Sequence, residues 1–94
     1  MTRCYIAGAV TGTTDFKERF GVAEWEVACL EMTPINPVDL PHKHNKSWES
    51  YMKECIVALL KCDCIFLLEG WEKSKGAIME FEIAASLNYP VYHQ

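Results

Sequence analysis

The feature that most constrains the fold is the uninterrupted apolar run at residues 64–68, which lies between two segments of helical periodicity. A run of this length predicts a strand that is buried on both faces, as the strands of a parallel sheet are. Parallel neighbours have to be joined by crossover connections, which are usually helices. The run therefore predicts an α/β fold in which a short parallel sheet is flanked by helices.

The other segments fit this plan. Strand-forming residues at 3–7 predict a first strand, and the prolines of 32–37 predict a short strand at the edge of the sheet. Helices are predicted at 15–31, 48–61 and 75–88, and a last short strand at 91–92, whereas 38–46 is predicted to be a loop. Asp15 with Glu18 resembles a capping box, and Ser47 is a predicted N-cap. The side chains predicted to face the core from the three helices are Phe16, Phe20, Ala23, Val27 and Leu30; Trp48, Met52, Cys55, Ile56, Leu59 and Leu60; and Met79, Ile83, Ala84 and Leu87.

This order of elements predicts a single domain at 1–94 with a three-layer Rossmann- or flavodoxin-like fold and about four parallel strands. Ligands of such sheets bind beyond the carboxyl ends of the strands, where the strand order reverses. The glycine-containing loops at 8–14 and 69–76 both follow strands and should open at that edge. Their glycines do not form the GxGxxG pattern, so a dinucleotide fingerprint is not supported.

The start of the third helix is the most informative stretch for function. Gly76 leaves room for a ligand to approach the helix start, and Glu80 lies about one turn inside the helix. A helix N-terminus favours a bound anion, for which Ser74 would be a hydrogen-bond donor. The alternative is that Ser74 is an ordinary N-cap and Glu80 a solvated charge of the first turn.

Composition narrows the function classes. A net charge of −4 argues against a nucleic-acid backbone as the main partner. No apolar run approaches the ~20 residues of a membrane span, and no signal-peptide pattern opens the chain, so we expect a cytoplasmic protein.

The five cysteines include no CxxC pair, which predicts reduced, buried thiols. The spacing of Cys62, Cys64, His42 and His44 fits no common zinc site, and we expect neither a metal nor a cofactor. His42 and His44 lie in the predicted loop, where they are either ligands of a phosphate or base, or simply exposed.

Five short motifs carry a resemblance to a known superfamily. They are Tyr5-Ile6-Ala7-Gly8, Asn36-Pro37, Cys62-Asp63 before an apolar strand, Ser74-x-Gly76-x-x-x-Glu80, and Asn88-x-Pro90-Val91. In order and spacing they resemble the nucleoside 2-deoxyribosyltransferase superfamily, above all its small members and the nucleoside 5'-monophosphate N-glycosidases. The resemblance spans nearly the whole chain.

The resemblance implies cleavage of the N-glycosidic bond of a (deoxy)nucleoside or its 5'-phosphate. Glu80 matches the glutamate that attacks the anomeric carbon to give a covalent glycosyl-enzyme, and Tyr5 matches a tyrosine beside it. At the position that matches Ser74, the resembling transferases of free nucleosides have an aspartate. An aspartate would repel a phosphate and a serine would donate to it, so Ser74 favours a 5'-phosphorylated ligand. The residues predicted to bind the substrate and its phosphate are Gly8, Ala9, Thr11, Gly12, Trp71, Ser74 and Gly76.

One departure from the family pattern concerns the acid. The family places an aspartate eight positions before the residue matching Asp63, to protonate the leaving base, and this chain has Cys55 there. Glu54 is rotated about 100° away on the helix, and Tyr51 is a weak acid one turn earlier. Asp63 should lie at the far edge of the sheet in a structural role.

Two functions from different classes therefore stay open. One is a nucleotide N-glycosidase, and the other is a non-catalytic protein that binds a nucleotide or a nucleotide-derived signal in the same pocket, which Cys55 favours. A ligand-free scaffold is the third alternative.

Trp71 either stacks on a base or caps the core. Glu82 faces away from Glu80. The resemblance also implies a homo-oligomer, most simply a two-fold dimer.

Overall fold

The computed structural model describes residues 1–10, 14–40 and 47–94. Within these ranges, four parallel strands form a sheet in the order β2-β1-β3-β4. Its strands are β1 (Arg3–Ala7), β2 (Thr33–Ile35), β3 (Cys64–Leu67) and β4 (Val91–His93), and its helices are α1 (Phe16–Cys29), α2 (Trp48–Leu60) and α3 (Lys75–Ser86). The predictions made for Thr11, Gly12, His42 and His44 lie outside the described residues.

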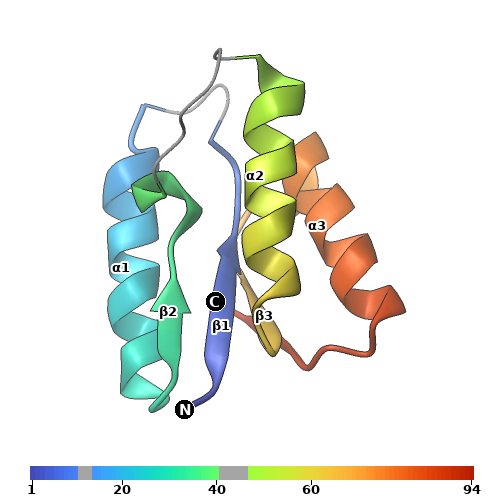
Figure 1. The fold of residues 1–94 in the computed structure, drawn as a ribbon. Coiled ribbons are helices and arrows are strands. Elements are labelled where there is room, and N and C mark those ends of the chain that lie inside the picture. The colour runs from blue at the N-terminus through green and yellow to red at the C-terminus, as the bar shows by residue number, and fades with distance from the viewer. Residues whose placement is uncertain (11–13, 41–46) are drawn as a thin grey trace.

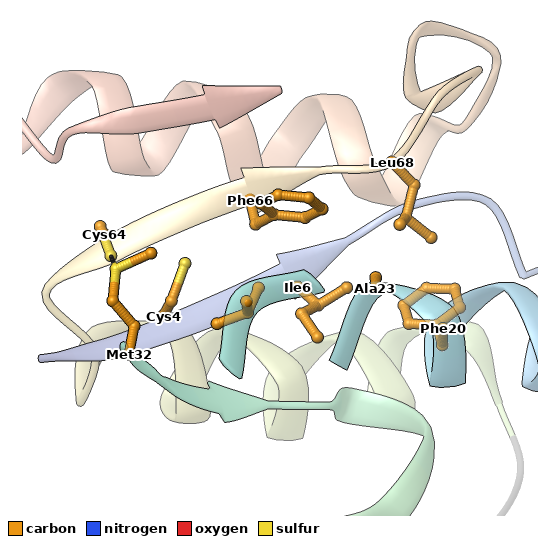
Figure 2. Close-up of a cluster of buried hydrophobic side chains, with 9 residues drawn as sticks. Cys4, Ile6, Phe20, Ala23, Met32, Cys64, Phe66 and Leu68 are labelled. Carbon is orange, nitrogen blue, oxygen red and sulfur yellow. Dashed lines mark hydrogen bonds between the residues drawn. The ribbon is translucent and has the colours of Figure 1, made fainter. Parts of the chain in front are cut away.

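The sheet is the middle of three layers. Helix α1 covers one face, and α2 and α3 cover the other (Figure 1). Because side chains alternate along a strand, Ile6 and Phe66 pack with Phe20 and Ala23 of α1, as Figure 2 shows. Tyr5 and the residues that alternate with Ile6 and Phe66 pack on α2 and α3 instead. The prediction of a flavodoxin-like α/β fold with an edge strand at β2 is confirmed.

The helix ends and one helix face differ from the prediction. Leu30, Leu60 and Leu87 were expected in the core, but all three are exposed. Leu30 and Leu87 follow the last helical residue, and Leu60 is the last residue of α2. The buried face of α3 runs through Gly76, Ala77, Glu80 and Ala84, whose small members let the helix lie close to the sheet. Met79 and Ile83 flank that face and are only half-buried.

The predicted caps and loops are partly confirmed. Ser47 Oγ accepts a hydrogen bond from Ser50 N, and Ser74 Oγ accepts one from Ala77 N, both at 3.2 Å. The capping box at Asp15 is wrong, because the Asp15 side chain makes no cap hydrogen bond. A short 3-10 turn at Pro37–Asp39 spans the boundary between the segments predicted as strand 32–37 and loop 38–46, and another lies at Trp71–Lys73 in the loop predicted at 69–73.

The thiols and the far edge of the sheet follow the prediction with one exception. Four cysteines are free and buried, but Cys29 is exposed on the last turn of α1. The Asp63 carboxylate accepts a hydrogen bond from Arg3 N at 3.0 Å, which ties the start of β3 to that of β1 as a structural role requires. In the part of the chain that the structure covers, no helix is long and apolar enough to cross a bilayer.

Candidate functional site

A small cavity lies where the strand order reverses. The next strand after β1, β2, pairs with one side of β1, and the following strand, β3, pairs with its other side. The loops that leave β1 and β3 therefore lie next to each other at the carboxyl edge of the sheet. The cavity has a volume of about 40 Å³. The described residues that line it are Tyr5, Gly8, Val10, Phe20, Pro37, Trp48, Tyr51, Met52, Cys55, Ser74, Gly76, Ala77 and Glu80.

Glu80 is the buried acid of this cavity. Its side chain is only 5 % exposed, and it accepts a hydrogen bond from the hydroxyl of Tyr5, which is fully buried on β1. Burial raises the pKa of Glu80 to about 7, although the hydrogen bond from Tyr5 acts in the opposite direction. The alternative that Glu80 is a solvated first-turn charge is therefore wrong. A carboxyl group that is ionised only in part at neutral pH can act as a nucleophile or exchange a proton.

Cys55 and Tyr51 stand beside this pair. Cys55 lies on α2 within hydrogen-bond reach of the hydroxyls of Tyr5 and Tyr51, and burial raises the pKa of its thiol to about 11. Burial also raises the pKa of Tyr51 well above its usual range. Both groups therefore hold their protons tightly at neutral pH. Glu54 lines a different groove, with Arg3, Lys53 and Lys61, as its rotation on the helix predicts.

The residues at the start of α3 both cap the helix and line the cavity. Ser74 is the N-cap of α3, so the structural interpretation of this serine is confirmed, and its side chain also lies at the cavity. The room predicted at Gly76 is taken up within the protein. A Cβ atom added there would lie 2.9 Å from the sulfur of Met52 and 3.9 Å from Nε1 of Trp48. Gly76 thus allows α2 and α3 to approach each other.

Gly8 is required by packing in the same way. A Cβ atom at this position would lie 2.5 to 2.9 Å from three side-chain atoms of Leu68, which is fully buried. We expect Gly8→Ala to lower the free energy of unfolding by about 1–3 kcal/mol, because the core has no space for the extra methyl group. Chemical denaturation measures this change.

Gly21→Ala is the matched control for that substitution. Gly21 is exposed within α1, and an added Cβ atom would meet nothing within 4 Å. Alanine there should raise the free energy of unfolding by about 0.5–1 kcal/mol through helix propensity. Equal effects of the two substitutions would show that Leu68 yields freely and that packing does not require Gly8.

Two predicted binding residues lie apart from the described lining. The ring of Trp71 packs on Phe81 with their centroids 4.9 Å apart, and Trp71 joins the core beneath α3. These contacts fit the alternative in which Trp71 caps the core.

Ala9 is half-buried and is not among the lining residues either. The loop that holds Trp71 is tied to α1, because Arg19 Nη2 donates to the carbonyl oxygen of Glu69 at 2.6 Å.

Sequence reasoning missed part of the lining. Val10, Pro37 and Met52 contribute apolar surface, and Trp48 contributes an aromatic ring. Trp48 directly follows the N-cap Ser47, so its position at the ligand edge of α2 was a usable signal. Among the described residues, no cluster of three histidine, cysteine or acidic side chains could hold a metal ion.

Comparisons with known proteins agree with this fold. A family model described as "Domain of unknown function (DUF4406)" matches residues 2–93. The fold is similar to a solved structure reported as a 2-deoxyribosyltransferase from the psychrotolerant bacterium Bacillus psychrosaccharolyticus, with a TM-score of 0.75 and 19% sequence identity. That match covers 98% of this chain and 71% of the other. No curated protein matches the chain. The superfamily resemblance that the motifs indicate is confirmed at the level of the fold.

Proposed function

The chain belongs to the DUF4406 family, and from this premise we propose that it cleaves the N-glycosidic bond of a (deoxy)nucleoside 5'-monophosphate. The observation that carries the proposal is the buried Glu80, held by the hydroxyl of Tyr5 in a cavity at the switch point of the sheet. The similarity in fold to a 2-deoxyribosyltransferase supports the same class of chemistry.

In the proposed reaction, a carboxylate oxygen of Glu80 attacks the anomeric carbon, and the bond from that carbon to the base nitrogen breaks with its electron pair leaving on the base. Water then cleaves the glycosyl ester and regenerates the carboxylate. Tyr5 orients the attacking group through its hydrogen bond to Glu80 Oε2. Ser74 and the backbone N–H groups at the start of α3 would face the 5'-phosphate.

The small volume of the cavity limits how much of a nucleoside monophosphate could enter it. A volume of about 40 Å³ suits a small group next to Glu80, whereas whole ligands fill pockets of roughly 300–1,000 Å³. We therefore propose that the reacting end of the sugar enters the cavity, and that the base and phosphate lie at its rim.

The alternative function is a non-catalytic protein that binds a nucleotide or nucleotide-derived signal in the same place. Cys55 favours it, because a buried thiol whose pKa is about 11 is a poor donor for the leaving base. Loss of a positioned acid typically lowers a rate by ~10²–10⁴-fold.

Incubation with a panel of ribo- and deoxyribonucleoside 5'-monophosphates separates the two functions. Release of free base, followed by chromatography, is the expected result for the glycosidase. Absence of release from every compound, together with a rise in Tm on addition of a nucleotide, would contradict the enzyme and support the binding protein.

The pH dependence of base release is a further expected result. Attack requires the ionised form of Glu80, so the rate should rise with pH through about 7 and then level off. Tyr5 lowers the pKa of Glu80, so Tyr5→Phe should move the midpoint of this curve upward and reduce the plateau. Initial rates between pH 5 and pH 9 give both midpoints. A wild-type rate that does not change between pH 5 and pH 9 would contradict attack by a Glu80 carboxyl group with a raised pKa.

A further inference from the structure

Trp48 is an aromatic side chain that lines the cavity, and we take it to stand at the cavity rim. It is the first residue of α2, is half-buried, and lines the same cavity as Glu80 and Ser74. Trp71, the aromatic residue that sequence reasoning singled out, is packed on Phe81 instead. A base at this rim would therefore meet the indole of Trp48, and aromatic rings stack on bases of every kind.

Lys75 holds a cation against this indole. Its Nζ lies 4.7 Å from the centroid of the Trp48 ring, in a cation–π contact. The side chain is exposed, and the residue directly follows Ser74 at the start of α3. None of the described residues that line the cavity is a lysine or arginine. A phosphate bound next to Ser74 would thus take its compensating charge from the rim, where Lys75 lies.

The junction between α2 and α3 keeps Trp48 and Lys75 together. Gly76 follows Lys75, and the position of its missing Cβ lies 3.9 Å from Nε1 of Trp48. The side chains of Trp48 and Met52 therefore pack directly against the start of α3. The cation of Lys75 thus directly follows the predicted phosphate donor Ser74 in the chain and contacts the indole of Trp48, which lines the same cavity as Ser74.

Resting on the proposed function, we propose that Trp48 and Lys75 form the recognition site for the base and the 5'-phosphate of a nucleoside monophosphate. In the free protein the ammonium group covers the indole. When the ligand binds, the ammonium moves to the phosphate and the freed indole face receives the base. The exchange is favourable, because a charge-assisted hydrogen bond to a phosphate is stronger than an exposed cation–π contact.

Calorimetric titration in a Glu80→Gln background tests the role of Lys75 without turnover. The probes are AMP, GMP, CMP and UMP, their deoxy forms, and the matching nucleosides. Lys75→Gln should weaken monophosphate binding about tenfold. Nucleoside binding should not weaken, because a nucleoside has no phosphate for the ammonium group to contact and its base has to displace that group from the indole. Lys73→Gln is the matched control, because it removes the same charge from an exposed position two residues earlier. It should change neither affinity.

Two substitutions of Trp48 test the stacking role. Trp48→Leu should weaken the binding of monophosphates and nucleosides alike by about tenfold. Trp48→Phe keeps an aromatic face and should keep most of the affinity, which also guards against a simple folding defect in the leucine variant. In a Trp25→Phe, Trp71→Phe variant, Trp48 is the remaining tryptophan, and its fluorescence should change with AMP.

The outcomes separate this inference from the proposed function. If the Glu80→Gln protein binds monophosphates but Lys75→Gln and Lys73→Gln behave alike, the recognition site is overturned and the proposed function stands. An unchanged affinity in Trp48→Leu overturns the stacking role in the same way. If the Glu80→Gln protein and the wild type bind none of the probes, the proposed function itself fails and the inference fails with it.

Discussion

Replacing Glu80 with glutamine should lower the rate of base release by about 10³-fold or more, because the variant has no carboxylate to attack the anomeric carbon. Glutamine has nearly the same shape and can still accept the hydrogen bond from Tyr5. A lost rate would therefore report lost chemistry rather than a collapsed cavity. Single-turnover assays with a monophosphate that the wild type cleaves measure this change.

The same substitution should stabilise the protein above neutral pH. Burial raises the pKa of Glu80 from 4.5 to about 7, so between these values the folded protein binds more protons than the unfolded chain. The free energy of unfolding therefore falls as the pH rises through this window. At about 1.4 kcal/mol for each pKa unit, the full effect is roughly 3 kcal/mol. Glu80→Gln removes the effect and should gain about 3 kcal/mol at pH 8, but less than about 1 kcal/mol at pH 5.

Glu82→Gln is the control for both effects. Glu82 lies two positions along α3 but is exposed, so its substitution should change neither the rate nor the pH dependence of stability. Denaturant titrations at pH 5 and pH 8 compare the three proteins. A Glu80→Gln protein that is less stable than the wild type at pH 8 would contradict a buried carboxyl group with a raised pKa.

The second large effect is expected from Cys55→Asp, which should raise the rate of base release by about 10²-fold. Retaining glycoside chemistry uses a nucleophile and an acid, and Cys55 occupies the position next to Glu80 where the acid would stand. A second carboxyl group beside Glu80 in a buried site should titrate at a raised pKa, because the two charges repel each other. The aspartic acid would then be protonated at neutral pH and able to donate to the leaving base.

The pH–rate profile distinguishes a true acid from a change of shape. Cys55→Asp should turn the rising profile of the wild type into a bell, with a falling limb where the new acid ionises. Cys55→Asn has nearly the same size but no proton of suitable acidity, and should show no gain. A folded Cys55→Asp protein that binds monophosphates without faster release would contradict the assignment of Cys55 to the acid position.

Much of the fold could be predicted from the properties of residues that are neighbours in the sequence. The apolar run at 64–68 became a strand buried on both faces, and the prolines of 32–37 placed β2 at an edge. Ser47 and Ser74 cap the helices that they were predicted to cap. These features depend on the backbone preferences and hydrogen-bonding capacity of neighbouring residues, which a sequence displays directly.

Which particular side chains are buried was harder to predict from the sequence. Leu87 fits the helical period of α3, yet it is exposed because the helix has ended before it. Glu80 looked equally suited to solvent, but the packing of α3 against β1 and α2 encloses it. The sequence left Trp71 open between stacking on a base and capping the core, and in the structure its ring packs on Phe81.

By its sequence alone, this chain determined the order of its elements, the parallel sheet and the two loops that meet at its carboxyl edge. The tertiary structure decided which side chains share the cavity. Tyr5 and Glu80 are 75 residues apart and meet because α3 lies close on the face of β1, where Ala77 and Ala84 leave it room. The raised pKa of Glu80, the neutral thiol of Cys55 and the place of Trp48 beneath Lys75 all depend on that packing. Burial and electrostatic environment come from neighbours in space, and those neighbours are set by how whole elements pack.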